Sequence, residues 1–366
     1  MGDQKPLVWY FPKVNSMPRR ETAALKPQGG TPIGQRPPEQ KASSQGMPAK
    51  ANPKSDAVKG AGAGAPLPSE PADLSPLEMA KMAVQKIQNG ERKRLKALWI
   101  ETSGCFAEFV AMLNGSDPDI LYWLTQMVGL TFFASIMADQ GELAYQDIVN
   151  VVESGEEYLL VVSGAIPLAQ GGHCAVIAKY EGRLITAEEA VKYAAAKARD
   201  VFCIGTCACY GGPTAASPNE TEAVDVKTLL NREVIRAPGC PCHPEWALGI
   251  FAYLVNFGQP PVDEEGRPLV YYGNFIHTIC PRRSFFDMQD FASKFGSPEC
   301  MFALGCRGPI TKTSCPFTRW NNSNNWPIGA NTTCIGCANS GFPDKMEPFV
   351  TYSTGGGAED NDEDVD

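Results

Sequence analysis

Between residues 95 and 257, short apolar stretches alternate with loops and with longer amphipathic segments. The apolar stretches are typical of buried strands that run into loops, and they lie in KALWIE (ending at 101), 158–168, 200–212 and 234–246. Helical patterns over 106–115, 186–198 and 243–257 lie between or after them. Strand, loop and helix in alternation predict an α/β fold, a doubly wound parallel sheet with helices on both faces.

The start of the folded region is marked by Ser75-Pro76-Leu77-Glu78. This is a capping-box pattern with proline at the first helical position, and the predicted helix ends at Asn89-Gly90. We therefore expect one domain over residues 76–261. Its loops at the carboxyl ends of the strands are where such sheets bind ligands.

The two ends of the chain differ in composition from this domain. Residues 1–75 are rich in proline, contain no cysteine and include KGAGAGAP at 59–66, which predicts a disordered extension. The alternative is an arm that orders by wrapping a partner, with LVWYFP at 7–12 as an apolar anchor. Residues 350–366 carry acidic residues and no basic one, as expected of a solvated tail.

Regular periodicity is lost over residues 262–349, where Gly, Pro, Asn and Cys are frequent and apolar runs are short. A segment of this kind needs a source of stability other than packed helices or strands. Metal–thiolate bonds can supply it. The sequence therefore predicts a second, irregular domain organised by a metal group.

The composition of the 366 residues favours a protein with a real core, since 43% are apolar and 20% charged. A net charge of −9 argues against a nucleic-acid binder. We find no secretory signal pattern, and we expect a cytoplasmic protein, with recruitment to a membrane surface by a partner as the alternative. Thirteen cysteines in a reducing compartment favour metal binding over disulfides.

Most of the cysteines fall into three sets along the chain. The first follows three predicted strands, the second includes a histidine, and the third has three members; they are Cys105, Cys207, Cys209, Cys240 and Cys242, then His277, Cys280, Cys300 and Cys306, then Cys315, Cys334 and Cys337. Cys203 lies inside a predicted strand and is expected to pack as a small apolar residue. Cys174 belongs to none of the sets.

The ligand types of these sets favour iron–sulfur clusters over zinc. Three thiolates and one imidazole suit either a tetrahedral zinc or a four-iron cluster. The third set has three cysteines and no fourth, as a three-iron cluster requires. A zinc site also does not account for the five cysteines of the first set. Cys-Pro at Cys240, Cys280 and Cys315 is a recurrent feature beside iron–sulfur clusters.

The cysteine motifs, taken in order, resemble the small subunit of the nickel–iron hydrogenases over roughly residues 95–345. The resemblance is carried by Thr102-Ser103-Gly104-Cys105, Gly205-Thr206-Cys207, Pro238-Gly239-Cys240-Pro241, His277-x-x-Cys280-Pro-Arg, Cys300, Leu304-Gly305-Cys306-Arg-Gly-Pro, Cys315-Pro and Cys334-Ile-Gly-Cys337. It implies a flavodoxin-like first domain and three iron–sulfur clusters in a row.

The resemblance also implies which residues hold each cluster. The ligands would be Cys105, Cys207 and Cys240 for the proximal cluster, Cys315, Cys334 and Cys337 for a medial three-iron (3Fe-4S) cluster, and His277, Cys280, Cys300 and Cys306 for a distal four-iron (4Fe-4S) cluster. Where some relatives have a fourth medial cysteine, this chain has Pro327, which favours the three-iron form.

One position departs from the family pattern. The first proximal ligand is usually the leading cysteine of Cys-x-x-Cys, and that position here is Thr102. Three outcomes remain open: a three-iron proximal cluster, an oxygen ligand from Thr102 or Glu101, or a sulfur ligand from Cys209 or Cys242. The last two give an unusual four-iron cluster.

The resemblance implies a hydrogenase that works as a hetero-oligomer. Hydrogen would be split on a large subunit, and this chain would relay the electrons through its clusters to an acceptor protein or a quinone. Two other functions compete. One is a non-hydrogenase iron–sulfur subunit related to respiratory quinone reductases, which shares only the first domain and the proximal site. The other is a zinc-stabilised scaffold protein.

Overall fold

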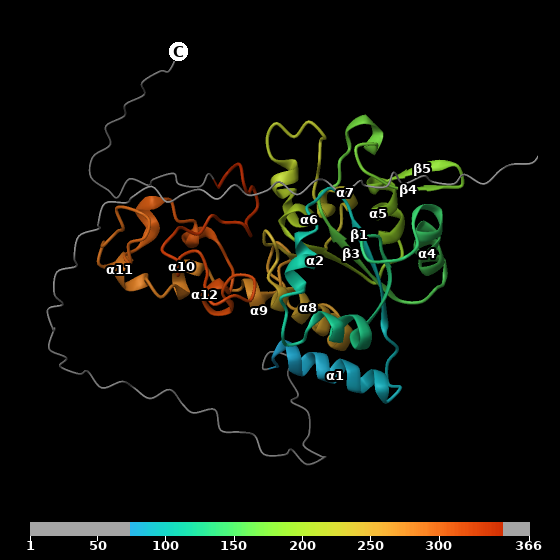
Figure 1. The fold of residues 1–366 in the computed structure, drawn as a ribbon, viewed down its shortest axis with the longest axis horizontal. Helices are drawn as coiled ribbons and strands as arrows, with labels where there is room; N and C mark the ends of the chain where they lie inside the picture. The colour runs from blue at the N-terminus through green and yellow to red at the C-terminus, as the bar shows by residue number, and fades with distance from the viewer. Residues whose placement is uncertain (1–73, 347–366) are drawn as a thin grey trace, which may run out of the picture. The chain divides into compact units, whose positions relative to one another are not determined.

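The computed structural model describes residues 74–346, which fall within one compact unit. Its centre is a sheet of five strands in the order β2-β1-β3-β6-β7, with every neighbouring pair parallel (Figure 1). The strands are β1 Leu95–Glu101, β2 Val128–Phe133, β3 Tyr158–Ser163, β6 Asp200–Ile204 and β7 Ile235–Ala237. The predicted parallel α/β architecture is confirmed.

Helices cover both faces of this sheet because its strands are apolar on both sides. Trp99 of β1 and Phe202 of β6 pack on one face with helices α1 and α8, whereas Leu98 and Ile100 pack on the other face with α4 and α5. The helices are α1 Pro76–Gln88, α4 Gly141–Glu153, α5 Ala187–Ala195 and α8 Pro244–Phe257. Such two-sided burial is what a parallel sheet with crossover helices requires.

Trp99 is the centre of the first of these cores. It is 1% exposed, and its ring stacks on Phe133 of β2 with 4.6 Å between centroids. Its indole N–H donates to Ser163 Oγ at the end of β3 (2.9 Å). The indole thus satisfies its one polar group while it fixes the end of β3 beside β1.

The first helix begins where the capping box predicts. The Glu78 N–H donates to Ser75 Oγ (3.3 Å), and the Ser75 N–H donates to the Glu78 carboxylate (2.8 Å). The C-cap is Asn89. The buried side of this helix, which includes Met79 and Ala83, packs against α8.

Replacing Ser75 by alanine should therefore loosen this helix without changing the rest of the fold. The loss of a cap costs about 1 kcal/mol, which corresponds to roughly fivefold faster amide exchange in the first turn. Hydrogen exchange followed by mass spectrometry would measure this, with the peptide covering α8 as the internal reference. Equal exchange in both proteins would show that the cap contributes nothing.

The α/β part also contains a hairpin and further short helices, among them α3 Ile120–Tyr122 and α7 Val226–Leu230. An antiparallel hairpin of β4 Val176–Tyr180 and β5 Arg183–Thr186 precedes α5, and Thr186 caps that helix through a second capping box with Glu189. Helix α2, Ala107–Met112, follows β1 directly.

Residues 262–346 contain only short helices, as the loss of periodicity predicts. Those labelled in Figure 1 are α9 Leu269–Tyr272, α10 Ile276–Ile279, α11 Arg283–Asp287 and α12 Cys315–Thr318. Side chains satisfy the backbone between them: Arg282 donates to the carbonyl oxygens of Ser297 (3.2 Å) and Glu299 (2.9 Å).

One local prediction is wrong. Residues 206–210 were expected to be a loop after a strand, and they form the short helix α6, Thr206–Tyr210. Glycines in left-handed backbone conformations, Gly205 (φ 84°) and Gly211 (φ 88°), end the helix on either side. The predictions for residues 1–73 and for the acidic tail lie outside the described residues. Within residues 74–346, no helix combines the length and the apolarity needed to cross a bilayer.

Candidate functional site: three cysteine-lined centres

The carboxyl ends of four neighbouring strands form the first centre. Strands β1, β3, β6 and β7 are adjacent and parallel, so the segments that follow them meet at one edge of the sheet. Cys105 follows β1, Cys207 follows β6 and Cys240 follows β7. Three of the predicted ligands, from segments far apart in the sequence, are thus brought to one edge.

Glycine at the end of β3 allows the chain to approach closely here. Gly164 has a φ of 91°, and a Cβ at this position would lie 2.6 Å from the Ser103 carbonyl oxygen and 2.7 Å from Thr102 Oγ1. Any larger residue would push apart the turns after β1 and β3. Gly164 therefore lets the turns that follow β1 and β3 pack directly against each other.

The three thiols of this centre influence one another electrostatically. Burial, together with the neighbouring groups Cys337, Cys207, Glu108 and Cys105, raises the pKa of Cys240 to about 12. Burial also raises the pKa of Cys207, although the Thr214 hydroxyl, 3.3 Å from its Sγ, lowers it. Cys105 is exposed.

Thr102 lies on the cavity of about 660 Å³ of empty space that Cys105 also lines. Its hydroxyl donates a hydrogen bond to the Ser163 carbonyl oxygen (3.0 Å). Glu101 lines the same cavity and accepts a hydrogen bond from the Ser135 hydroxyl. Both oxygen ligands considered from the sequence are thus near the centre and already hydrogen-bonded.

Cys209 and Cys242 lie elsewhere. Cys209 is fully buried in the core formed with α4 and α5, and its Sγ lies 3.4 Å from the Cys203 carbonyl oxygen. Cys242 is 1% exposed in the opposite core, among residues of α8. Neither lines the cavity of Cys105 and Thr102. Their contacts are those of packing residues, as Cys203 was predicted to be.

The second centre is a cavity of about 890 Å³ of empty space, part of it open to solvent. It is lined by Cys315, Cys334 and Cys337, the three cysteines of the third sequence set. Pro327 lines it as well, at the position where the resemblance suggested it. Cys240 also faces this cavity, so the first and second centres share a wall.

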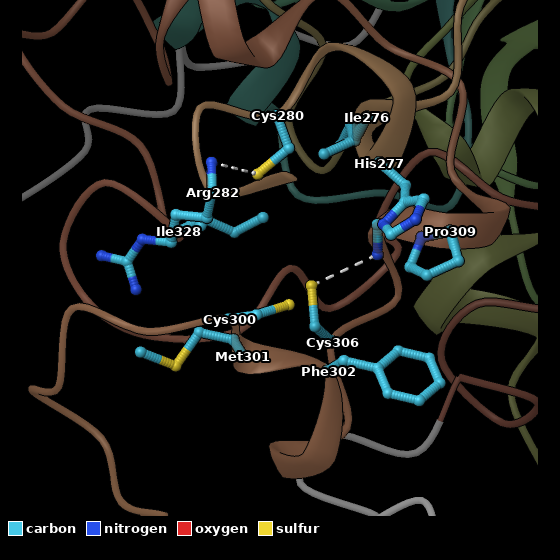
Figure 2. A pocket seen from close by; sticks show the side chains of 11 residues that line it. Ile276, His277, Cys280, Arg282, Cys300, Met301, Phe302, Cys306, Pro309 and Ile328 are labelled. Atoms are coloured by element: carbon cyan, nitrogen blue, oxygen red, sulfur yellow. Dashed lines mark hydrogen bonds between the residues drawn. The ribbon is translucent and has the colours of Figure 1, made fainter. Parts of the chain in front are cut away.

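The third centre gathers the complete second set. His277, Cys280, Cys300 and Cys306 line one cavity, and Figure 2 shows their side chains around a common space. The His277 ring packs edge-on against Phe286, with 4.4 Å between centroids. Burial lowers the pKa of His277, and Arg283 lowers it further. The imidazole is therefore held in the neutral form that binds metals.

The four side chains of the third centre do not converge on a single ion. In residues 74–346, no three His, Cys, Asp or Glu side chains come close enough together to share one. The four side chains instead line a pocket that is open to solvent on one side.

Hydrogen-bond donors point at sulfur in all three centres. The Arg282 and Gly308 N–H groups each lie 3.4 Å from a sulfur, Cys280 Sγ and Cys306 Sγ respectively (Figure 2). The Thr313 hydroxyl lies 3.1 Å from Cys315 Sγ. Donors of this kind stabilise sulfur that carries negative charge and tune cluster potentials.

Burial alone would oppose that charge. It raises the pKa of Cys315 to about 12 and that of Cys334 well above its ordinary value. A cationic group between the thiols reverses the preference, since a coordinated thiol is deprotonated. The donor set, the cavity and the N–H groups therefore fit iron–sulfur clusters.

The three centres are joined in sequence. Cys240 faces both the first and the second, and the Thr206 hydroxyl donates to the Cys337 carbonyl oxygen. The Arg307 N–H donates to the Cys334 carbonyl oxygen (2.8 Å), next to Cys306 of the third centre. The centres thus form a row, first to second to third.

Sequence reasoning missed Glu108. This residue lies on α2, three positions after Cys105, and is 6% exposed. Its pKa is raised to about 7, chiefly by burial and in part by the charge of Glu101, although a hydrogen bond from its own backbone N–H lowers it. It lines the cavity of Thr102 and Cys105. The sequence carried no signal for it, because Cys105 lies before the start of α2 and the two residues share no helix face.

His243 caps helix α8. Its Nδ1 accepts from the Glu245 N–H (3.1 Å) at the start of α8, and its Nε2 lies 3.1 Å from the Thr318 carbonyl oxygen. Burial lowers its pKa to about 4. The neutral ring joins the sheet domain to α12 in the cysteine-rich part.

A parallel α/β domain with cysteines at its strand ends, continued by a row of cysteine-lined cavities, defines an iron–sulfur subunit of an oxidoreductase. Comparison with known proteins identifies the family to which this subunit belongs. The family described as the C-terminal part of the NiFe/NiFeSe hydrogenase small subunit matches residues 272–350, and the family of the NADH ubiquinone oxidoreductase 20 Kd subunit matches residues 103–254.

Individual relatives agree. The chain is 35% identical over 263 residues to the periplasmic NiFe hydrogenase small subunit of Solidesulfovibrio fructosivorans, covering 70% of this chain and 82% of the relative. It is 32% identical to the quinone-reactive Ni/Fe-hydrogenase small chain of Wolinella succinogenes, over 80% and 82%. A solved structure of the NiFeSe hydrogenase of Dm. baculatum superposes with a TM-score of 0.67 and 33% identity, covering 71% of this chain and all of the other. The chain belongs to the nickel–iron hydrogenase small-subunit family, and its enzyme class is that of a hydrogenase acting as part of a complex.

Proposed function

We propose that this chain relays electrons between a nickel–iron centre on a large subunit and an acceptor, through the three centres in a row. The observation that carries the proposal is the complete distal set, His277, Cys280, Cys300 and Cys306, around one cavity beside a second cavity lined by three cysteines. A flavodoxin-like first domain is supported by the strand order, which is 2-1-3-4-5 once the hairpin is set aside.

The cluster assignment follows the three centres. We propose a proximal cluster on Cys105, Cys207 and Cys240, a medial three-iron cluster on Cys315, Cys334 and Cys337, and a distal four-iron cluster on His277, Cys280, Cys300 and Cys306. Bound clusters supply one-electron redox chemistry, while the protein sets potential and exposure. Trp246 and Trp326, which line the medial cavity, keep its wall apolar.

The proposed partner is a hydrogenase large subunit in a hetero-oligomer. Cys105 is exposed, and apolar side chains on the adjoining helices are exposed nearby on the chain: Val110 (48%), Leu113 (54%) and Leu121 (66%). A partner that covers them would also shield the proximal cluster from water. An acceptor protein or a quinone would take electrons at the distal end, and a cytoplasmic or membrane-peripheral location stays a proposal.

The two competing functions are less well supported. The respiratory subunit family matches only residues 103–254, and the proposed medial and distal ligands, which lie between His277 and Cys337, are outside that range. A zinc scaffold would need ligands that converge on one ion, and residues 74–346 contain no group of three His, Cys, Asp or Glu side chains placed to share one.

The test is a cluster inventory on the anaerobically purified complex. We expect a brown protein whose paramagnetic resonance spectrum, as isolated, contains a three-iron signal. Cys315→Ser should remove that signal, while Cys174→Ser, which changes an exposed cysteine outside the cavities, should leave it intact. A colourless protein with stoichiometric zinc would contradict the proposal and favour the scaffold.

A further inference from the structure

Five oxygen-bearing side chains line the cavity of Cys105, and all but Glu108 are hydrogen-bonded to other groups of the protein. Thr102 donates its hydroxyl proton to the Ser163 carbonyl oxygen, so a metal-bound alkoxide would lose this bond. Glu101 is half-buried and accepts from the Ser135 hydroxyl. Neither oxygen is held free for a metal.

Glu108 differs from both. Its side chain is 6% exposed, and among the described residues no Lys, Arg or His forms an ion pair with it. A buried carboxylate without a cation is costly and calls for a compensating positive group. The carboxylate therefore lies where a cation would stabilise it.

The fold makes room for this carboxylate beside the proximal cysteines. A Cβ at Gly205 would overlap Glu108 Oε1, so the glycine that ends β6 lets the carboxylate approach the start of α6. Cys207 lies two residues beyond that glycine. Glu108 also shares a cavity with Cys105.

We propose that the carboxylate of Glu108 is the fourth ligand of the proximal cluster, in place of the thiolate that residue 102 lacks. The inference rests on the proposed function, since it needs a cluster at this edge. Carboxylate and imidazole are established iron ligands, and clusters accept ligands other than cysteine. With Cys105, Cys207 and Cys240, Glu108 completes a four-iron set.

The decisive comparison is Glu108→Gln against Glu101→Gln in the purified complex. Both variants remove one carboxylate from the same cavity, and both keep the side-chain shape. Glu108→Gln should lose one iron per complex and gain a second three-iron signal in the oxidised resonance spectrum. Glu101→Gln should match the wild type in iron content and signal.

A second variant distinguishes the loss of a ligand from misfolding of the site. Glu108→Cys offers a thiolate at the same place and should restore the iron content, with a changed resonance spectrum of the reduced proximal cluster. Two three-iron signals in the wild type, or an unchanged spectrum and iron content in Glu108→Gln, would overturn the inference. Either result would leave the relay intact, whereas a wild-type complex without clusters would overturn the proposed function itself.

Discussion

A Pro327→Cys variant should convert the medial cluster from three to four irons. Pro327 lines the cavity of Cys315, Cys334 and Cys337. A cysteine at this position would therefore offer a thiol to the cavity as a fourth ligand. The proline has no N–H to lose, and its carbonyl oxygen, which accepts from the Ala330 and Thr332 N–H groups (3.1 and 3.0 Å), is kept.

The expected result is one more iron per complex and complete loss of the medial three-iron signal. The extra thiolate also adds a negative charge, which lowers the medial potential because net charge is one of its determinants. Pro327→Ala is the matched control, since it opens the same space without a ligand and should keep the three-iron signal. Retention of that signal in Pro327→Cys would refute the medial assignment.

Local rules were enough to predict much of the fold. The helix starts at Ser75 and Thr186 are set by side chains within three residues, and the buried strands of the sheet are read directly from apolar runs. These local signals predict the observed helices and strands correctly because the tertiary contacts of the fold favour the same elements. The parallel sheet follows from their alternation with helices.

Elements with mixed or very short signals escaped prediction. Strand β2 follows an apolar helical stretch, Ile120–Met127, without any turn residue, so periodicity cannot separate the two. Helix α6 has five residues, too few to show a helical period, and is defined by the glycines that flank it. The hairpin β4–β5 depends on pairing that a single strand does not reveal.

The site was predicted from residue type more than from geometry. Cysteine and histidine are recognisable as metal ligands from residue type alone, so the distal set could be grouped from the sequence without knowledge of its cavity. Glu108 could not, because its burial depends on Gly205, nearly a hundred residues later in the chain. The same holds for Cys240, whose place between two cavities depends on how the cysteine-rich part packs on the sheet.

The strongest functional effect is expected for His277→Cys at the distal end of the row. This substitution keeps four ligands but replaces a neutral imidazole, whose pKa is lowered by burial, with a charged thiolate. Imidazole ligands raise cluster potentials relative to thiolates, so the variant should have a lower distal potential. Since about 59 mV changes a one-electron equilibrium tenfold, hydrogen-driven reduction of an acceptor should fall by about tenfold or more.

Two measurements distinguish this effect on electron exit from a general loss of structure or activity. Hydrogen–deuterium exchange catalysed by the complex needs no electron exit and should be unchanged, while a redox titration of the distal signal should show the lowered potential. Phe286→Leu is the matched control, because it removes the ring that packs on His277 but leaves all four ligands, and it should keep most of the acceptor-linked activity. If His277→Cys reduced the acceptor at the wild-type rate with an unchanged distal potential, His277 would not be a ligand, and electrons would leave the protein by another route.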